Sequence, residues 1–400
     1  MWQQIQINKR NSVILLGLMG VVLTGLGFVV GFAFGGGPDA GWMGIFIATC
    51  VWIVMMLVSL YGGDQILLAS SRATPVTEEV HPQLFNVVEE MTLAANLPKM
   101  PNVYIINDPA PNAFATGRNP EHASVAVTAG LLGRLNRDEL QGVIAHEVSH
   151  IVHRDILFVT LAGVMLGTIV LISQVFLRGM FYSSMGGRRY SSRSREGGGA
   201  QATMMIAAVL LAILAPLFAQ ILYFALSRKR EYLADAGAVR LTRYPEGLAS
   251  ALEKIAGSPV SMESANQVTA PMYIANPFRG AKAMSLFSTH PPAEERIRIL
   301  RNMAHGAAFK DYNAAYSTVT HRGGVIPKAA MVSDEPVGVR AAAAAVAASP
   351  KQSQRQVGDI MRKVSGFTFI PCSCGVQLKL PPGFKARTVQ CPRCGRNHNV

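Results

Sequence analysis

Residues 141–150 read QGVIAHEVSH, and the spacing of their ionisable side chains decides how the rest of the chain is interpreted. In an α-helix, His146 and His150 stand one turn apart and about 40° apart around the axis, so both imidazoles can reach one metal ion. Glu147 lies about 100° from His146, close enough to act on a water molecule at that metal without being a ligand. Asn136 can cap the helix, with a glutamate at its third position completing a capping box. The stretch predicts a helix that carries two metal ligands and a base.

The same spacing also occurs by chance, in helices whose histidines form only hydrogen bonds, so this interpretation needs a third ligand. The metzincin arrangement is excluded because it requires glycine at position 153 and histidine at position 156, where the chain has His153 and Ile156. We therefore expect His153 on the helix surface.

Residues 156–177 contain no acid, and the next acidic residues are Glu196, Glu231 and Asp235. Glu196 lies in Gly- and Ser-rich sequence, a poor platform for a fixed ligand. Glu231 and Asp235 are four residues apart on one helix face, so Glu231 can bind the metal while Asp235 orients a histidine. The alternative is a surface charge network with the neighbouring arginines.

The composition of the 400 residues predicts a membrane protein. Half of the residues are hydrophobic and only 15% are charged, against about 25% in soluble domains. These values exclude a disordered or collagen-like chain. The apolar residues gather in four charge-free stretches, each long enough to supply the roughly 20 residues of a membrane span: 11–38, 40–63, 156–177 and 197–227. The first is too long for a signal peptide and is interpreted as an uncleaved anchor.

Gly27 and Gly31 form a small-xxx-small pair in the first stretch. Such a pair lets a helix approach its neighbour closely, here the second stretch across a short turn. The alternative is that glycine is merely tolerated in lipid.

Basic residues next to the apolar stretches favour a cytoplasmic location for the soluble parts by the positive-inside rule. They are Lys9, Arg10, Arg72, Arg154 and residues 228–230. The loop at 178–199 carries five more arginines, which argues against a simple third and fourth crossing: Arg178, Arg188, Arg189, Arg193 and Arg195. The sequence leaves open whether residues 156–177 and 204–226 fully span the bilayer or form a re-entrant or protein-packed hairpin.

The net charge of +13 comes mostly from the C-terminal tail, where residues 321–400 hold 12 Lys or Arg against three acidic residues. A basic tail can touch anionic lipid or nucleic acid, although a solvated tail is the default interpretation. We do not expect nucleic acid as the partner, although the charge of the tail alone does not distinguish nucleic acid from lipid or solvent.

Four cysteines close the chain in the pattern CSCG and CPRCG, with 16 residues between the two pairs. Two thiolate pairs suit one tetrahedral Zn²⁺, and short β-rich runs with a Pro-Pro-Gly turn lie around them. We expect a structural zinc ribbon with the ligands Cys372, Cys374, Cys391 and Cys394. Two disulfides or a redox-active pair are the alternatives.

The sequence predicts a chain of four parts. Residues 1–63 form a transmembrane hairpin, 64–310 a catalytic domain interrupted by a hydrophobic hairpin at 156–227, 311–366 a flexible linker, and 367–400 the ribbon. In the domain, a helix is predicted from about residue 82, strands at 103–106 and 124–128, and helices at 230–241 and 294–303.

Four motifs together resemble the HtpX-type membrane zinc metalloproteases, which are gluzincins with HExxH and a downstream ExxxD. The motifs are 146–150 (HEVSH), 230–235 (REYLAD), 111–117 (PNAFATG) and 288–297 (STHPPAEERI). The likeness covers about residues 1–304, and the four-cysteine tail is an addition to the family pattern. The resemblance implies a mainly α membrane protein with a zincin-like catalytic domain of helices and a small β-sheet.

By resemblance, one catalytic Zn²⁺ is held by His146, His150 and Glu231, with Glu147 as the general base and Asp235 behind the ligands. The resemblance further places His290 and Arg296 near the cleft, where they steady the oxyanion. It makes one segment the cleft edge to which substrate adds as a strand: Asn112, Ala113, Phe114, Ala115 and Thr116. Phe114 can also be plain core.

The resemblance implies a multi-pass enzyme of the bacterial plasma (inner) membrane that hydrolyses misfolded or damaged membrane proteins. The basic residues beside the apolar stretches predict that its catalytic domain lies in the cytoplasm. Strand addition reads backbone more than side chains, so specificity should be loose. The alternatives are a dedicated processing peptidase and a non-catalytic membrane adaptor that binds an unknown partner through the ribbon. The intact Glu147 disfavours the adaptor.

Overall fold

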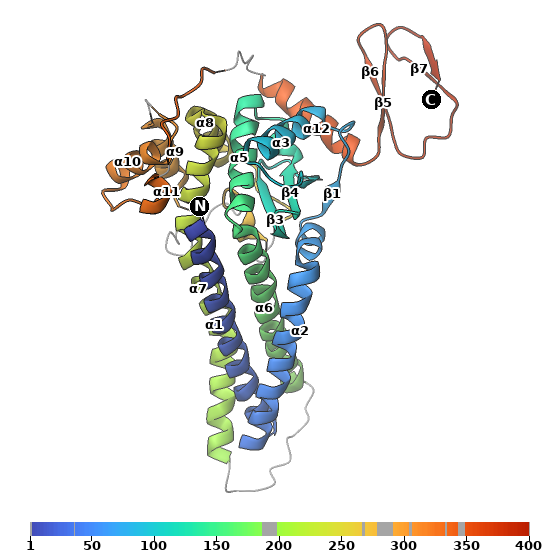
Figure 1. The fold of residues 1–400 in the computed structure, drawn as a ribbon. Coiled ribbons are helices and arrows are strands. Elements are labelled where there is room, and N and C mark those ends of the chain that lie inside the picture. The colour runs from blue at the N-terminus through green and yellow to red at the C-terminus, as the bar shows by residue number, and fades with distance from the viewer. Residues whose placement is uncertain are drawn as a thin grey trace.

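The structure is a computed structural model that describes residues 2–35, 37–185, 198–265, 269–277, 291–303, 306–332, 334–342 and 349–399. Four long helices form a stalk, and the remaining elements gather at one end of it (Figure 1). The stalk helices are α1 (Trp2–Gly35), α2 (Pro38–Ser70), α6 (Asp155–Met185) and α7 (Gly198–Thr242).

Each stalk helix contains a stretch that is long and apolar enough to cross a membrane, as the four charge-free stretches predict. The candidate spans are Leu16–Gly35, Pro38–Ser70, Asp155–Phe181 and Ala202–Ala219. The third and fourth candidate spans each lie within one continuous helix. The arginines at 188–195 and Glu196 lie outside the described residues, whereas Arg178 lies on α6.

The glycine pair on α1 makes the predicted close contact with α2. A side chain at Gly27 would overlap the backbone of Gly44, and one at Gly31 would overlap the carbonyl oxygen of Ala40. The two backbones therefore touch, which requires glycine at these positions and confirms the packing interpretation.

A four-stranded sheet in the order β1-β2-β4-β3 lies beside the upper end of the stalk. Its strands are β1 (Ala73–Pro75), β2 (Asn102–Ile106), β3 (Ala113–Asn119) and β4 (His122–Thr128). β2 and β4 are parallel, while β3 is antiparallel to β4 and forms an edge. The strands predicted at 103–106 and 124–128 are β2 and β4.

Helices form the main core together with the sheet. They are α3 (Pro82–Ala94), α4 (Ala129–Leu132), α5 (Arg137–Val152), α8 (Pro245–Gly257) and α9 (Ala293–Arg301), with a 3₁₀ turn η1 (Ala270–Met272). Asn136 and Glu139 form the predicted capping box at the start of α5. The fourth apolar stretch continues without a break into the helix predicted at 230–241, and both belong to α7. The upper part of α7 packs along α5.

The expectation of a flexible linker at 311–366 is wrong for much of that segment. Three helices occupy it: α10 (Phe309–Thr320), α11 (Lys328–Val332) and α12 (Pro350–Val364). Tyr312 and Tyr316 are buried in the main core, and Tyr316 packs edge-to-face against Tyr232 of α7. Aromatic residues at helical spacing bury one face of α10. The linker was predicted from the Ala- and Pro-rich composition nearby, which does not reflect this spacing.

Arg340 fastens the segment after α11 onto the domain. Its guanidinium donates to Asp138 of α5 at 2.7 Å and to the carbonyl oxygen of Thr242 at 3.0 Å. Farther on, Ser353 of α12 donates to the carbonyl oxygen of Gly133, and Val357 packs on Gly133 so closely that a side chain there would overlap it. The chain between the domain and the tail is thus attached to the domain in at least two places.

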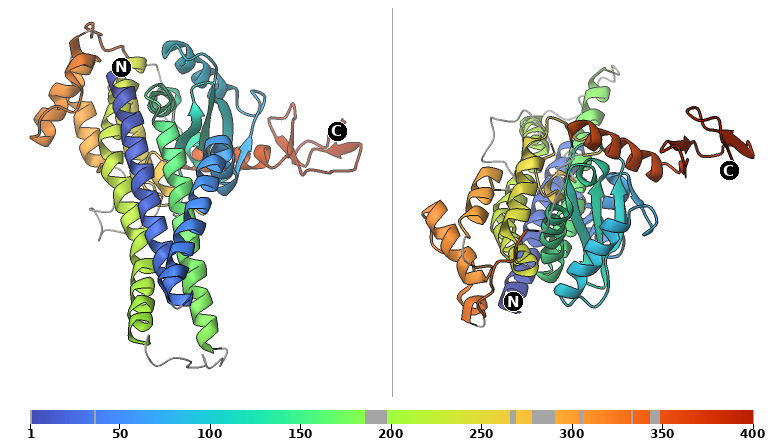
Figure 2. Two further views of the ribbon diagram at one scale, coloured as in Figure 1. Left: turned by 60° about the horizontal axis from the view of Figure 1, so that its bottom comes forward. Right: turned by 90° about the horizontal axis from the view of Figure 1, so that it is seen from above.

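Two small hairpins end the chain, β5 (Thr368–Pro371) with β6 (Gln377–Leu380) and β7 (Thr388–Gln390) with β8 (Asn397–Asn399). They extend sideways from α12, away from the stalk (Figure 2). The β-rich runs around the cysteines are therefore strands, as predicted.

Candidate metal centre

α5 presents His146 and His150 to the same point. Their Nε2 atoms lie 3.2 Å apart and their rings are perpendicular. Because each ring uses Nδ1 for a carboxylate, both Nε2 atoms have their lone pairs available for a shared cation.

Glu231 of α7 approaches this pair from the facing helix. Its carboxylate oxygens lie 3.7 Å from Nε2 of His146 and 3.6 Å from Nε2 of His150. One donor atom from each of the three residues lies within 4.8 Å of the others. Zinc bonds to nitrogen and oxygen of about 2.0–2.2 Å in a tetrahedron give donor separations of about 3.4 Å. The set fits Zn²⁺ with one position left for water or substrate.

Each histidine is oriented by a buried carboxylate. Nδ1 of His146 lies 2.9 Å from Asp235, and Nδ1 of His150 lies 3.2 Å from Asp155, the first residue of α6. Asp235 in turn receives two hydrogen bonds from Arg296, at 2.7 and 2.8 Å. Such carboxylates fix the tautomer and the direction of a metal-binding imidazole.

The charges at the site shift its pKa values. Burial alone lowers the pKa of His146, but hydrogen bonds with Asp235 and Glu231 outweigh it and raise that pKa to about 9. Burial would raise the pKa of Asp235, yet the Arg296 charge and the His146 hydrogen bond hold it below its ordinary value. The carboxylates around His146 therefore favour a positive charge at this point.

Glu147 lies 2% exposed beside the ligands. Burial raises the pKa of its carboxyl, against the opposing charges of His146 and His150 and a backbone hydrogen bond from Ala115. Glu147 lines a small cavity of about 20 Å³ together with His150 and Glu231. That volume accommodates about one water molecule.

The segment expected to form the cleft edge is mostly strand β3. Ala115 lines the small cavity, and the Thr116 hydroxyl lies 3.0 Å from that of Thr160 on α6. Asn112 precedes the strand and donates to the carbonyl oxygen of Ala275 at 2.9 Å. Phe114 is fully buried and packs edge-to-face on Tyr273, so its side chain belongs to the core, as the alternative stated.

Arg296 is 1% exposed, and its guanidinium is engaged by Asp235 and by the carbonyl oxygen of Ile274 at 3.0 Å. It therefore lies behind the ligands. His290 lies outside the described residues.

Sequence reasoning missed two residues here. Asp155 is only five residues from His150, and this short spacing at the end of α5 is the signal in the sequence that points to the contact. His153, expected on the surface, is 5% exposed, because α5 ends with its last turn packed against Gly237 of α7. Burial lowers the pKa of His153.

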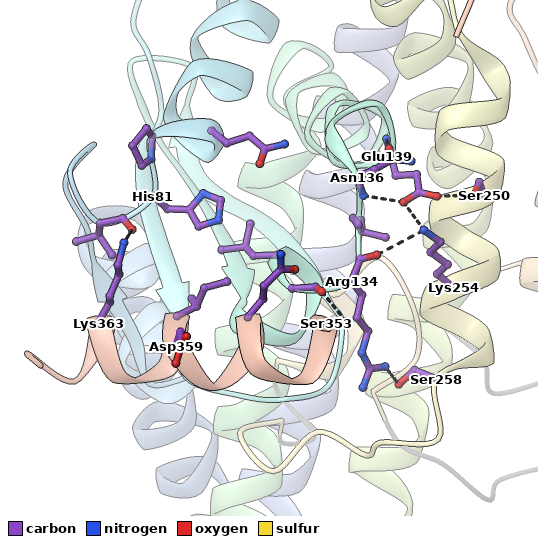
Figure 3. Close-up of a pocket in the computed structure, with 18 of the residues that line it drawn as sticks. His81, Arg134, Asn136, Glu139, Ser250, Lys254, Ser258, Ser353, Asp359 and Lys363 are labelled. Carbon is purple, nitrogen blue, oxygen red and sulfur yellow. Dashed lines mark hydrogen bonds and ion pairs between the residues drawn. The ribbon is translucent and has the colours of Figure 1, made fainter. Parts of the chain in front are cut away.

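A larger groove of about 1460 Å³ lies away from the metal centre, between α12 and the start of α5 (Figure 3). It is bordered by His81, Arg134, Lys254, Asp359 and Lys363. Lys254 donates to Glu139, which also caps α5. Its charged residues are of both signs, so the groove offers no concentrated charge to a ligand.

The four tail cysteines form a second potential metal site. Their Sγ atoms lie within 4.8 Å of one another, and three contacts measure 3.4 to 3.6 Å. Zn–S bonds of about 2.3 Å in a tetrahedron give about 3.8 Å between sulfurs. A disulfide bond of about 2.05 Å fits none of these contacts. Gly375 and Gly395 follow the pairs with positive φ, which turns the backbone around the sulfurs.

Comparisons with known proteins show which family the sequence matches. The profile of Peptidase family M48 matches residues 78–304. A "Protease HtpX homolog" of Ligilactobacillus salivarius is 46% identical over 305 residues, covering 76% of this chain and 100% of that protein. Another from Dictyoglomus thermophilum is 44% identical over 302 residues, covering 76% and 94%. Among solved structures, S. mikatae Ste24p matches with a TM-score of 0.39 and 19% identity, over 75% of this chain and 67% of that one.

Proposed function

Because the chain belongs to peptidase family M48, and is thereby a membrane zinc metalloprotease, we propose that it is an endopeptidase for misfolded or damaged membrane proteins. The single observation that carries the proposal is the convergence of His146, His150 and Glu231 beside Glu147, at the start of a candidate membrane span.

We assign one catalytic zinc to His146, His150 and Glu231, whose donor separations fit its coordination. When bound, zinc polarises the scissile carbonyl and lowers the pKa of water. Asp235 and Asp155 keep the two imidazoles directed at it.

Glu147 is the general base in this proposal. It removes a proton from the attacking water as the oxygen bonds to the carbonyl carbon, and it passes that proton to the amine as the C–N bond breaks. Its burial beside a cavity of about one water molecule supports this role, because water there has few other places to deliver a proton. Family resemblance also assigned a role near the cleft to His290, which remains a prediction.

The depth of the site supports membrane proteins as substrates. Asp155 holds His150 and is also the first residue of the span Asp155–Phe181. Ile156 and Val159, one turn into that span, line the same cavity as Glu147. A peptide bond at Glu147 therefore lies close to the end of the membrane-spanning bundle, where segments next to a substrate's own span arrive first.

The edge strand β3 is the proposed binding edge for the substrate backbone. Ala115 lines the cavity, and Thr116 is tied to Thr160 of the span, so the strand is held at the same depth. An extended, unfolded segment can pair with such an edge, whereas a folded domain cannot.

We place the catalytic domain in the cytoplasm of the plasma membrane. The N-terminus with Lys9 and Arg10 lies at the same end of the stalk as the domain (Figure 1), and so do Arg72 and Arg154. Basic residues gather on the cytoplasmic side. Reporter fusions after Ser71 and after Gly257 should both report the cytoplasm, and external protease reaching either site in intact cells would overturn this placement.

We assign a second, structural zinc to the four cysteines, whose closed thiolate set leaves no position for water. Thiolate ligands also agree with a reducing cytoplasm. The ribbon is then a docking module for an unknown partner. The ribbon extends sideways from α12, away from the stalk, which supports a partner in solution rather than lipid.

The test is performed in liposomes with three matched substrates that contain one unfolded segment: tethered to a membrane span, free in solution, or replaced by a folded domain. We expect cleavage in the order tethered, free, folded, because a shared membrane raises the effective concentration. Glu147→Gln is the control for contaminating protease. Cleavage of only one sequence among several unfolded segments would favour a dedicated processing peptidase, and no cleavage by the wild-type protein would favour the adaptor.

A further inference from the structure

We propose that Arg230 is a further catalytic residue, whose guanidinium binds the oxygen of the scissile carbonyl as that oxygen gains negative charge. This inference rests on the proposed peptidase function and names the residue that stabilises its transition state.

Arg230 reaches the reaction cavity from α7. It precedes the ligand Glu231 and is 7% exposed, whereas its neighbours Arg228 and Lys229 are exposed. Arg230 lines the cavity of about 20 Å³ together with Glu147 and His150. Arg230 therefore borders the small space beside Glu147, next to which the scissile carbonyl must lie.

Packing against an aromatic ring orients the guanidinium. Its central carbon lies 3.5 Å from the centroid of the Phe158 ring, which belongs to the first turn of α6 and to the core of the stalk. Stacking on an aromatic face orients a guanidinium and offsets part of the cost of removing it from water. The charge is thus fixed before the reaction, which is the condition for effective electrostatic stabilisation.

Arg296, the other buried arginine of the site, is less suited to this role. Its three nitrogens are directed to Asp235, to the carbonyl oxygen of Ile274 and toward Glu231. It does not line the cavity with Glu147. Arg296 is thus a positioning residue that holds Asp235 against His146, and the oxyanion role assigned to it by resemblance passes to Arg230.

The chemistry requires no proton from Arg230. As the water oxygen bonds to the carbonyl carbon, the π electrons of the C=O bond move to its oxygen, and Glu147 takes the water proton. Arg230 donates hydrogen bonds to that oxygen and keeps its own protons. The C=O bond forms again when the C–N bond breaks, and the amine leaves with the proton from Glu147.

The experiment compares Arg230→Gln and Arg230→Lys with Arg228→Gln and Lys229→Gln, two exposed cations on the same helix. The full-length protein is tested in detergent with an unfolded peptide substrate, and kcat, KM and zinc content are measured. Binding of a phosphinic peptide, which mimics the tetrahedral intermediate, is measured by calorimetry beside that of an uncleaved substrate analogue.

We expect Arg230→Gln to retain zinc and lower kcat by about 10²- to 10³-fold, with little change in KM. Phosphinic peptide affinity should fall by a similar factor, while substrate-analogue affinity stays near wild type. Arg230→Lys should recover part of both losses, and the two control variants should match wild type.

An unchanged kcat in either zinc-loaded Arg230 variant would overturn the assignment, as would a loss of kcat without weaker binding of the phosphinic peptide. If Arg230→Gln fails to fold, Arg230→Lys decides alone, because it keeps the charge but lacks the planar fork. If the wild-type protein cleaves nothing and binds no phosphinic peptide, the proposed function itself has failed.

Discussion

Asp235→Asn separates two tasks of one buried carboxylate. Asp235 accepts from Nδ1 of His146 at 2.9 Å and from two nitrogens of Arg296, and it is fully buried. The amide keeps the size of the side chain but removes its charge. Loss of a carboxylate behind a histidine ligand costs about 10- to 100-fold in metal affinity, or roughly 1.4 to 2.7 kcal/mol.

The same change leaves the Arg296 charge buried without its anion. Breaking one side of a buried ion pair costs about 3 to 5 kcal/mol of stability. We therefore expect Asp235→Asn to weaken zinc binding and to lower the unfolding temperature, even with zinc saturating. Adding Arg296→Gln should recover part of the stability but not the zinc affinity, because the charge is removed while His146 stays unsupported.

The assay measures the zinc Kd by competition with a chelator, and thermal unfolding in detergent with and without zinc. Asp155→Asn is the matched control, because Asp155 supports His150 and is not the partner of Arg296. It should weaken zinc binding with a smaller loss of stability. A zinc Kd for Asp235→Asn equal to that of wild type would refute the orienting role.

Three further predictions follow from separate parts of the chain. Replacing Cys391 and Cys394 by Ser should lower the metal content by one zinc per chain and leave hydrolysis of an unfolded peptide nearly unchanged; lost hydrolysis with the catalytic zinc still bound would place the ribbon in the active site. His81 accepts from the backbone of Leu84 at 3.1 Å, and burial lowers its pKa from 6.5, so the unfolded chain binds the proton more tightly and stability falls as the pH drops below about 6.5. His81→Asn keeps a capping acceptor that does not titrate, so its unfolding temperature should fall less between pH 7.5 and 5.5, and an equal fall would contradict this. Gly31→Leu should separate α1 from α2 and lower stability in detergent, whereas Gly25→Leu should not, because within the part of the chain that the structure describes no atom lies within 4 Å of a Cβ added there. Equal effects would show that the contact is unimportant.

Local patterns in the sequence were enough to predict the elements that carry the chemistry. The capping box at Asn136 and the spacing of His146 and His150 are properties of one helix, and both are found in the structure. The four apolar stretches and the paired cysteines are likewise local signals, and the structure places each as expected.

Contacts between distant residues could not be predicted in this way. The pairing of Arg296 with Asp235 joins positions 61 residues apart, and it depends on the packing of α9 beside α7. The burial of Tyr312 and Tyr316 depends on a surface formed by α7, so composition alone indicated a linker. The sequence around Arg230 also fits a charged surface, whereas in the structure the ring of Phe158, from another helix, stacks on its guanidinium.

The most direct measurement of the central claim determines zinc content and peptide hydrolysis side by side for the wild-type protein, Glu147→Gln and His146→Ala. We predict that Glu147→Gln keeps the catalytic zinc and loses hydrolysis by about 10²- to 10⁴-fold, because only the base is removed. His146→Ala should lose both that zinc and the activity. A Glu147→Gln protein that hydrolyses peptide at the wild-type rate would contradict the account.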